Sequence, residues 1–130
     1  SFMLREVSQL VKSKVEYKDR LFVGNVHLVC PHHKLLDLIN SWDAPNASTL
    51  QGMGPVHASK ASRRGLRLDH LFNDRADARR RLLLDMKEYW RALALLGKTE
   101  AELLVIAQQS SKIQPHVVDF IKAPCLSGEY

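Results

Sequence analysis

A stripe of apolar residues in the second half of the chain constrains the fold more than any other sequence feature. Its members recur at spacings of four, three, four and three, which is the repeat of one face of an α-helix. They are Leu82, Met86, Tyr89, Leu93 and Leu96. Asn73 or Asp74 can cap the start of this helix, and Gly97 can end it. The sequence therefore predicts one long amphipathic helix between residues 74 and 97.

Shorter helices are predicted on both sides of this one. Apolar residues at helical spacing predict one amphipathic helix within residues 2–14 and another after Pro31. Thr99 and Glu102 form a capping box, in which each side chain satisfies a free backbone N–H group of the other residue. This box begins a third helix, and Pro115 suits the first turn of a final short one.

Residues 22–30 show a different hydrophobic repeat. Phe22, Gly24, Val26, Leu28 and Cys30 alternate with a more mixed set, and a period of two is typical of a β-strand covered on one face. Residues 15–17 could pair with this strand through a turn at residues 18–19, forming a β-hairpin. We therefore predict an α+β fold: a short N-terminal helix, a β-hairpin or small antiparallel sheet with a packed helix, then a helical C-terminal half.

Periodicity disappears between residues 43 and 65, where Pro, Gly, Ser and Ala are frequent. A stretch this long without regular structure is uncommon inside a compact domain, so we interpret it as a flexible loop or linker. The predicted organisation is a β-hairpin plus helices over 1–42, the loop over 43–65, a helical segment over 66–123 and a tail over 124–130. Together these parts would form one compact domain.

Two short motifs lie within residues 17–40. The first is Phe22-Val23-Gly24-Asn25-Val26-His27-Leu28, and the second is Lys34-Leu35-Leu36-Asp37-Leu38-Ile39-Asn40. Together they resemble a small strand-helix module of uncharacterised bacterial proteins, in which a Gly-containing strand precedes a helix that reads like R-L-S-D-L-L-N. The resemblance implies a strand followed by a packed helix, and it implies no activity.

The composition excludes several classes of protein. Of the 130 residues, 45% are hydrophobic and 25% are charged, as in an ordinary globular domain. No apolar run reaches the ~18–20 residues of a membrane span. The two cysteines, Cys30 and Cys125, are too few for a disulfide scaffold, and no secretory signal is visible. We therefore expect reduced thiols, a cytoplasmic location and no membrane span.

Positive charge is concentrated in one part of the chain. The formal net charge is +5, and residues 51–97 alone hold ten cations and five anions, which gives +5; residues 1–50 carry +1 and residues 98–130 carry −1. The clustered cations are Lys60, Arg63, Arg64, Arg67, Arg75, Arg79, Arg80 and Arg81. The planar fork of Arg suits phosphate and carboxylate groups. This stretch is the candidate site for a polyanion, either nucleic acid bound through its phosphates or an acidic protein. The alternative is that these cations have no ligand and form a solvent-exposed face with local Asp–Arg ion pairs.

The densest group of metal-ligand residue types is His27, Cys30, His32 and His33. Their spacing matches no standard zinc motif, and alternation along the predicted strand separates His27 from Cys30. A Cys–His catalytic pair would need hydrogen-bond contact and a third group to orient the base. We therefore interpret His32 and His33 as an exposed pair beside a buried thiol, and we predict no metal, no cofactor and no catalytic residue.

These observations favour a non-enzymatic binding or regulatory domain, whose Arg-rich loop and helix start contact nucleic acid. The alternative is a protein–protein adaptor or a subunit of a larger assembly, including a homo-oligomer. This alternative rests on a set of large apolar side chains that is sizeable for a small chain and could form an interaction surface. They are Trp42, Met86, Tyr89 and Trp90. An enzyme or a metal-binding protein is the less favoured interpretation, because no pair of residues is fixed at a distance suited to acid–base catalysis.

Overall fold

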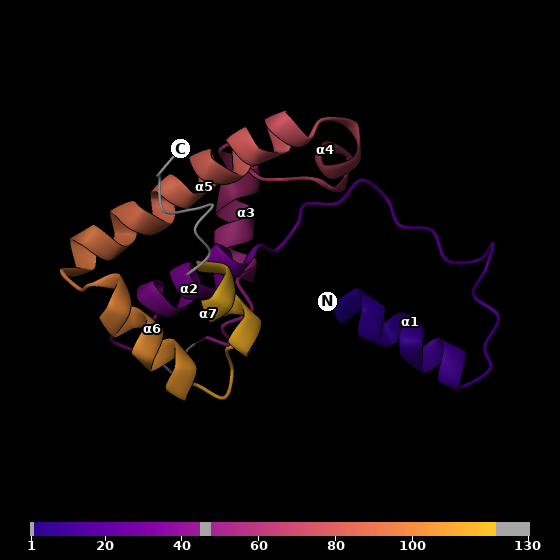
Figure 1. Ribbon diagram of the computed structural model, residues 1–130, viewed down its shortest axis with the longest axis horizontal. Coiled ribbons are helices and arrows are strands. Elements are labelled where there is room, and N and C mark those ends of the chain that lie inside the picture. Colours follow the sequence, from indigo (N-terminus) through magenta and orange to yellow (C-terminus); the bar gives the residue numbers. More distant parts are fainter. Residues whose placement is uncertain (1, 45–47, 122–130) are drawn as a thin grey trace.

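The computed structural model describes residues 2–44 and 48–121, and this part of the chain contains seven helices (Figure 1). They are α1 (Phe2–Lys12), α2 (Pro31–Asn40), α3 (Met53–Ala61), α4 (Leu68–Asn73), α5 (Arg75–Leu96), α6 (Glu100–Gln109) and α7 (Pro115–Ile121). The helices expected within residues 2–14, after Pro31 and from Pro115 are therefore confirmed as α1, α2 and α7.

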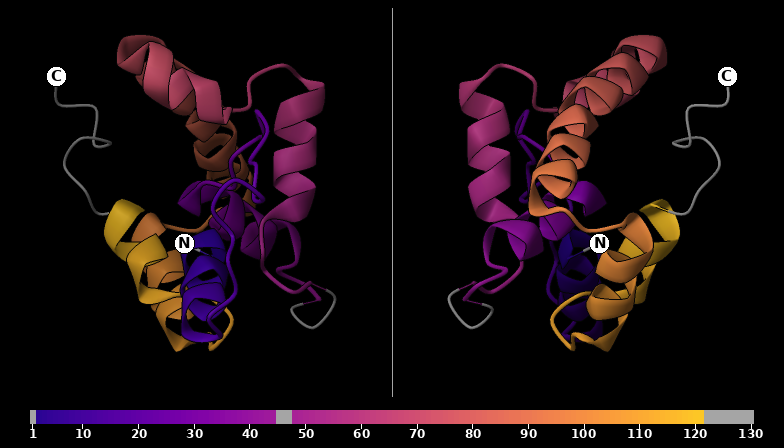
Figure 2. Two further views of the ribbon diagram at one scale, coloured as in Figure 1. Left: turned by 90° about the vertical axis from the view of Figure 1, so that its right-hand side faces the viewer. Right: turned by 90° about the vertical axis from the view of Figure 1, so that its left-hand side faces the viewer.

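Helices α2 to α7 form the body of the molecule (Figures 1 and 2). α2 lies at its centre and packs against α3, α5 and α7, while α4 packs against α5 and α6 packs against α7. The largest fully buried apolar side chains come from four of these helices: Leu35, Met86, Tyr89, Leu103 and Val117. Removal of this apolar surface from water is the main contribution that stabilises the body.

The long helix α5 follows its sequence signals. The Asp74 side chain accepts hydrogen bonds from two backbone N–H groups of the first turn, and Gly97 ends the helix with a φ of 69°. The predicted apolar stripe lies against the core. α6 begins with the predicted capping box, in which Thr99 and Glu102 each accept a hydrogen bond from the backbone N–H of the other. The predictions for these two helices are confirmed.

The prediction of an α+β fold with a β-hairpin is wrong. Among residues 2–44 and 48–121, the only β-type pairing is an isolated antiparallel bridge between His27 and Arg67. Its two hydrogen bonds join Leu28 N–H to the Leu66 carbonyl (2.8 Å) and Leu68 N–H to the Val26 carbonyl (3.0 Å). A period of two predicts an extended backbone, but a sheet also requires neighbouring strands, and the described chain offers none. The fold is helical.

Residues 2–29, here called the N-terminal arm, lie mostly outside the body. α1 stands apart from the other helices, and a long extended segment joins it to α2 (Figure 1). Several large apolar side chains of the arm are exposed, and Phe22 has 83% of its surface in contact with solvent. Among the alternating residues that predicted a strand, Phe22 and Val26 are exposed, whereas Leu28 and Cys30 pack in a small apolar cluster with Leu66 and Ala78.

Helix α3 lies inside residues 43–65, for which the sequence predicts a flexible loop or linker. Gly52 precedes it with a φ of 77°, and a Cβ at this position would lie 3.0 Å from the His33 backbone, so α3 starts in close contact with α2. Asp37 holds the residues before α3, because its carboxylate accepts hydrogen bonds from Ser48 Oγ (2.9 Å) and Gly52 N–H (3.0 Å). The buried apolar side chains of α3 are few, which explains why its sequence shows little periodicity.

The other proposed domain boundaries stay predictions. The expected tail at residues 124–130 and Cys125 lie outside the described residues. None of the helices in the described ranges combines the length and the apolar character that a membrane crossing requires.

Candidate functional site

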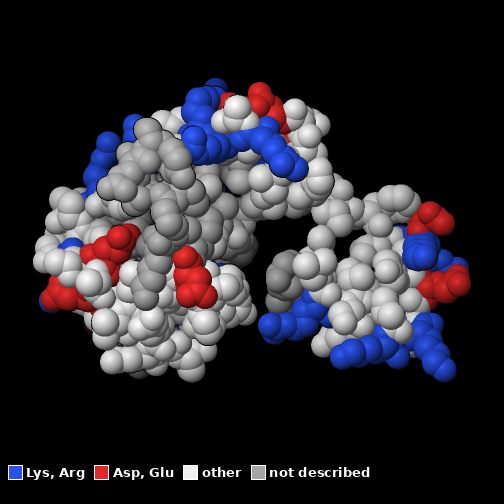
Figure 3. All heavy atoms as spheres, in the orientation of Figure 1, with Lys and Arg blue, Asp and Glu red and all other residues white. Residues whose placement is uncertain are grey.

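A partly open pocket of about 340 Å³ lies where the end of α3, the start of α4 and the first half of α5 meet the N-terminal arm. We call it the cationic pocket; its lining residues are His27, Lys60, Arg63, Gly65, Arg67, His70 and Arg81. Four of these side chains are Lys or Arg, and none is acidic. Figure 3 shows Lys and Arg side chains gathered at this end of the molecule, beside a few acidic ones. The lining has the charge of an anion site.

The turn after α3 gives the pocket its shape. The Ser59 carbonyl accepts hydrogen bonds from Arg64 N–H (3.0 Å) and Gly65 N–H (3.1 Å), which turns the chain back at the end of the helix. Arg63 lies within this turn with a φ of 59°, in the left-handed region. A Cβ at Gly65 would lie 2.8 Å from Cδ2 of His27, so the absence of a side chain there lets the imidazole ring approach.

Two of the pocket cations are not neutralised. Arg67 pairs with Asp69 (3.2 Å), and Arg81 donates to Asp77 (2.6 Å). Lys60 and Arg63, in contrast, form no ion pair with any acidic residue of the described chain.

The positive charges around the pocket also affect the pKa of His27. Burial lowers the pKa of His27, and the charges of Lys60 and Arg67 lower it further. The pocket therefore has excess positive charge that a bound anion would balance.

The structure divides the eight predicted basic residues into two groups. Lys60, Arg63, Arg67 and Arg81 line the cationic pocket. The other four do not line it: Arg64 pairs with Glu88 (3.0 Å), Arg80 pairs with Asp77, and Arg75 and Arg79 are exposed. The sequence alone could not separate these groups, because all eight have the same chemistry.

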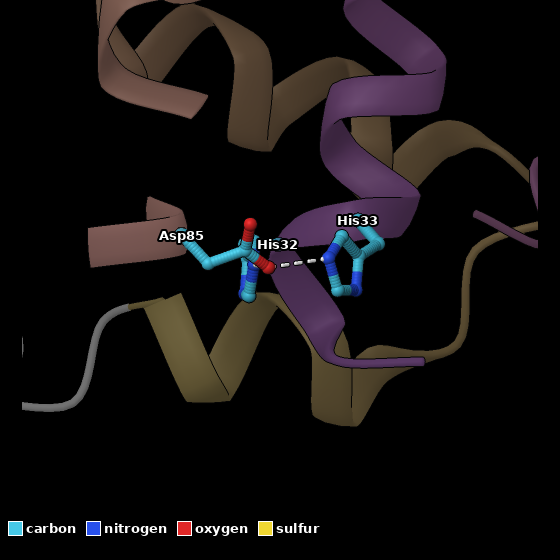
Figure 4. A group of neighbouring side chains, drawn as sticks. All are labelled: His32, His33 and Asp85. Atoms are coloured by element: carbon cyan, nitrogen blue, oxygen red, sulfur yellow. Dashed lines mark hydrogen bonds and ion pairs between the residues drawn. The ribbon is translucent and has the colours of Figure 1, made fainter. Parts of the chain in front are cut away.

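A second polar cluster is buried between α2, α3 and α5. Asp85 Oδ2 accepts hydrogen bonds from His32 Nε2 (3.0 Å) and His33 Nε2 (2.7 Å), and Asp85 Oδ1 accepts one from Ser59 Oγ (2.5 Å). Figure 4 shows the carboxylate of Asp85 pointing at the two imidazole rings. We call these four residues the Asp85 cluster; each is no more than 5% exposed. A single carboxylate thus joins three helices.

The proton positions in the Asp85 cluster follow from one backbone contact. Cys30 N–H donates to His33 Nδ1 (2.9 Å), so the other ring nitrogen of neutral His33 carries the proton that it donates to Asp85. Burial lowers the pKa of His32, against the opposing effect of its hydrogen bond to Asp85. Burial alone would raise the pKa of Asp85, but the hydrogen bonds from His32, His33 and Ser59 hold it well below its ordinary value. The cluster is therefore a carboxylate surrounded by neutral donors.

The hydrogen bond from Cys30 N–H to His33 Nδ1 argues against a metal centre in this cluster. His32, His33 and Asp85 have ligand atoms within 4.8 Å of one another, as a metal site would require. A metal at His33 Nε2 would need a lone pair there, and the proton would then move to Nδ1, where it would face the N–H of Cys30. The hydrogen-bond pattern therefore fits a network of side-chain hydrogen bonds better than a metal site.

The interpretation of His32 and His33 as an exposed pair is wrong, because both side chains are 1% exposed. Cys30 is buried, as expected, and burial raises the pKa of its thiol to about 12. A thiol that keeps its proton is a poor nucleophile, so Cys30 and its neighbouring histidines do not form an activated Cys–His pair. His27 lies apart from this group, in the cationic pocket.

Asp85 and Ser59 were missed by sequence reasoning, although Asp85 leaves a signal. It lies three residues after Leu82 and four before Tyr89, which places a carboxylate on the apolar face of α5. A carboxylate on a buried face needs hydrogen-bond partners, and a pair of histidines is one source of them. Ser59 has no comparable signal, because its burial depends on the packing of α3.

Comparison with known proteins gives a consistent result. The family model for adenylosuccinate synthetase matches residues 1–124. Relatives with this name are 49% identical in Trypanosoma brucei brucei and 44% identical in Leishmania major, in each case over 128 residues and 95% of this chain. A relative in Trypanosoma cruzi, named adenylosuccinate synthetase 2, is 47% identical over the same length. No solved structure matches the chain significantly.

The chain spans about a fifth of the length of these relatives, since it covers 21% of the first, 20% of the Trypanosoma cruzi protein and 18% of the Leishmania protein. These matches overturn two interpretations of the sequence. The resemblance of residues 17–40 to a bacterial module is wrong, because it rested on a short alternation and a few Leu and Asp positions.

The interpretation as a nucleic-acid-binding or regulatory domain is also wrong, because a concentration of Arg residues measures charge and does not identify a ligand. A match over nearly the whole chain identifies an enzyme family instead: the chain belongs to the adenylosuccinate synthetase family.

Proposed function

We propose that the protein carrying this chain has the activity for which its relatives are named, the synthesis of adenylosuccinate, and that the cationic pocket binds an anionic group of the substrate or product. The observation that carries the second part is the pair Lys60 and Arg63, two cations that line one pocket without an acidic partner among the described residues. Lys and Arg in such a position favour binding of a phosphate or a carboxylate.

The chemistry of adenylosuccinate supports this assignment. The molecule is a purine nucleoside monophosphate that carries a succinate group, so it presents both phosphate and carboxylate oxygens. A pocket of about 340 Å³ is near the lower end of the ~300–1,000 Å³ range of small-molecule sites. The pocket could therefore take one anionic end of a nucleotide.

The surroundings of the pocket also favour a small anion over a long one. Asp69 and Asp77 lie beside the pocket arginines and pair with them. A nucleic-acid backbone laid across this face would meet these carboxylates as well as the cations, whereas a single phosphate or carboxylate can contact Lys60 and Arg63 alone. A cytoplasmic location remains part of this proposal, with the expectation of reduced cysteine thiols.

The test is an assay of adenylosuccinate formation by the intact protein that carries this chain, with the product measured by mass spectrometry. We expect the wild-type protein to form adenylosuccinate. Lys60→Ala and Arg63→Ala should each raise the KM for the anionic substrate by about tenfold, the loss expected for one charge-assisted hydrogen bond.

Lys87→Ala is the matched control, because Lys87 is an exposed cation of α5 outside the pocket lining. Its KM should equal that of the wild-type protein. Absence of product with the wild-type protein would overturn the proposed activity. Product formation with an unchanged KM in both pocket variants would overturn the assignment of the pocket.

A further inference from the structure

We propose that Asp85 is a positioning residue for the cationic pocket: through Ser59 it fixes the turn that carries Arg63. This inference rests on the proposed function, since it takes the pocket to be an anion site. Asp85 itself does not line the pocket, so it would act on a bound anion only through the residues that it holds.

The first link is the contact between Asp85 and α3. Asp85 Oδ1 lies 2.5 Å from Ser59 Oγ, which donates to it, and both side chains are almost fully buried. Asp85 Oδ2 is held at the same time by His32 and His33 at 3.0 and 2.7 Å. With both oxygens bonded, the carboxylate has little freedom to rotate, so the position of Ser59 is fixed relative to α2 and α5.

The second link runs from Ser59 into the pocket. Its carbonyl accepts the backbone N–H groups of Arg64 and Gly65, and these two hydrogen bonds close the turn that contains Arg63. Lys60 follows Ser59 directly in the chain. A shift of Ser59 therefore moves Lys60 and Arg63, the two pocket cations that form no ion pair with a described acidic residue.

The third link connects Asp85 to the opposite wall of the pocket, which Arg81 of α5 lines. Arg81 lies four residues before Asp85 on α5, so the two side chains emerge from the same face of the helix, one turn apart. Asp85 thus connects the helix that carries Arg81 to the helix that carries Lys60. The distance between the two walls depends on the Asp85–Ser59 contact.

The experiment measures binding of inorganic phosphate to the intact protein by isothermal titration calorimetry, together with the melting temperature of each variant. Ser59→Ala removes the hydroxyl and leaves the carboxylate bonded to both histidines. Asp85→Asn keeps the shape of the side chain but replaces one acceptor oxygen with an NH₂ group, which faces the donors of His32, His33 and Ser59. We expect each variant to weaken phosphate binding by about tenfold, which corresponds to the loss of one well-placed contact.

Two control variants separate positioning from general stability and from the site itself. Leu103→Ala creates a cavity in the core away from the pocket, so it should lower the melting temperature without changing phosphate affinity. Arg63→Ala removes a pocket cation and should weaken phosphate binding directly.

The outcomes distinguish the two proposals. If Arg63→Ala leaves phosphate affinity unchanged, the pocket is not the anion site and the proposed function of the pocket fails. If Arg63→Ala weakens binding but Ser59→Ala does not, the positioning role of Asp85 is overturned. An equal loss of affinity in Leu103→Ala would also overturn it, because the effect would then follow stability. Should Asp85→Asn fail to fold, Ser59→Ala decides the question by itself.

Discussion

Two carboxylates of the same helix behave in opposite ways. Asp77 lies near the start of α5, where it pairs with Arg80 and with Arg81 (2.6 Å) and keeps 26% of its side chain exposed. Asp85 lies eight residues later, where it is 2% exposed and bonded to neutral imidazoles and a hydroxyl. One carboxylate contacts cations in solvent, and the other contacts neutral donors in the interior.

Both groups have a lowered pKa, but for different reasons. Hydrogen bonds from Arg81 and Arg80 lower the pKa of Asp77. Burial opposes ionisation of Asp85, and three hydrogen bonds overcome that effect. Because water can replace the partners of Asp77 but not those of Asp85, a similar pKa direction conceals very different contributions to stability. The predictions below contrast the two sites.

The largest effect is expected for Asp85→Ala. This change leaves three buried donors, on His32, His33 and Ser59, without an acceptor. Loss of one partner from a buried polar network costs about 3–5 kcal/mol, so the local opening free energy of α2, α3 and α5 should fall by that amount. Hydrogen exchange of backbone amides in the intact protein measures it. Unchanged exchange in these helices would contradict the importance of the cluster.

A smaller effect is expected from pH, through His32. Because the pKa of His32 is lowered in the folded state, the unfolded chain takes up a proton first as pH falls through the ordinary value of 6.5. Stability is therefore full above pH 6.5 and should decline below it, by at most about 1.4 kcal/mol per pH unit.

The measurement is hydrogen exchange of α2 and α5 between pH 7.5 and 5.5, corrected for the intrinsic pH dependence of exchange. His32→Gln removes the titrating ring and is the matched comparison. If both proteins lose stability at the same rate in this window, His32 is not the group responsible.

The smallest effect is expected for Asp77→Ala. This change removes two exposed ion pairs and an acidic side chain near the positive end of α5. The expected loss of helix protection is a small fraction of that for Asp85→Ala, and high salt should abolish it by screening. A loss that equals the Asp85→Ala effect, or that persists at high salt, would remove the contrast between the two sites.

The sequence predicted most of the helical elements, because their signals are local. Asp74, Gly97 and the Thr99 capping box act within one turn of the chain, and the stripe of α5 reports a buried face directly. The alternation at residues 22–30 wrongly predicts a strand, because this segment makes only an isolated bridge. Alternation specifies an extended backbone, while pairing depends on what lies beside it.

The candidate site was only half predictable for a related reason. Charge is visible in the sequence, so the pocket cations Lys60 and Arg63 were among the predicted residues. Which cations lack a partner depends on the positions of Asp69 and Asp77 in the fold. His32 and His33 follow Pro31 and looked exposed, and nothing local indicated that a carboxylate more than fifty residues away would bury them.

The isolated bridge between His27 and Arg67 has a mechanical consequence. Its two backbone hydrogen bonds connect the N-terminal arm to the chain just before α4, and both residues of the bridge line the cationic pocket. A displacement of the arm would therefore act directly on the pocket wall, as well as on the apolar cluster in which Leu28 packs. The bridge thus couples the position of the arm to the lining of the cationic pocket.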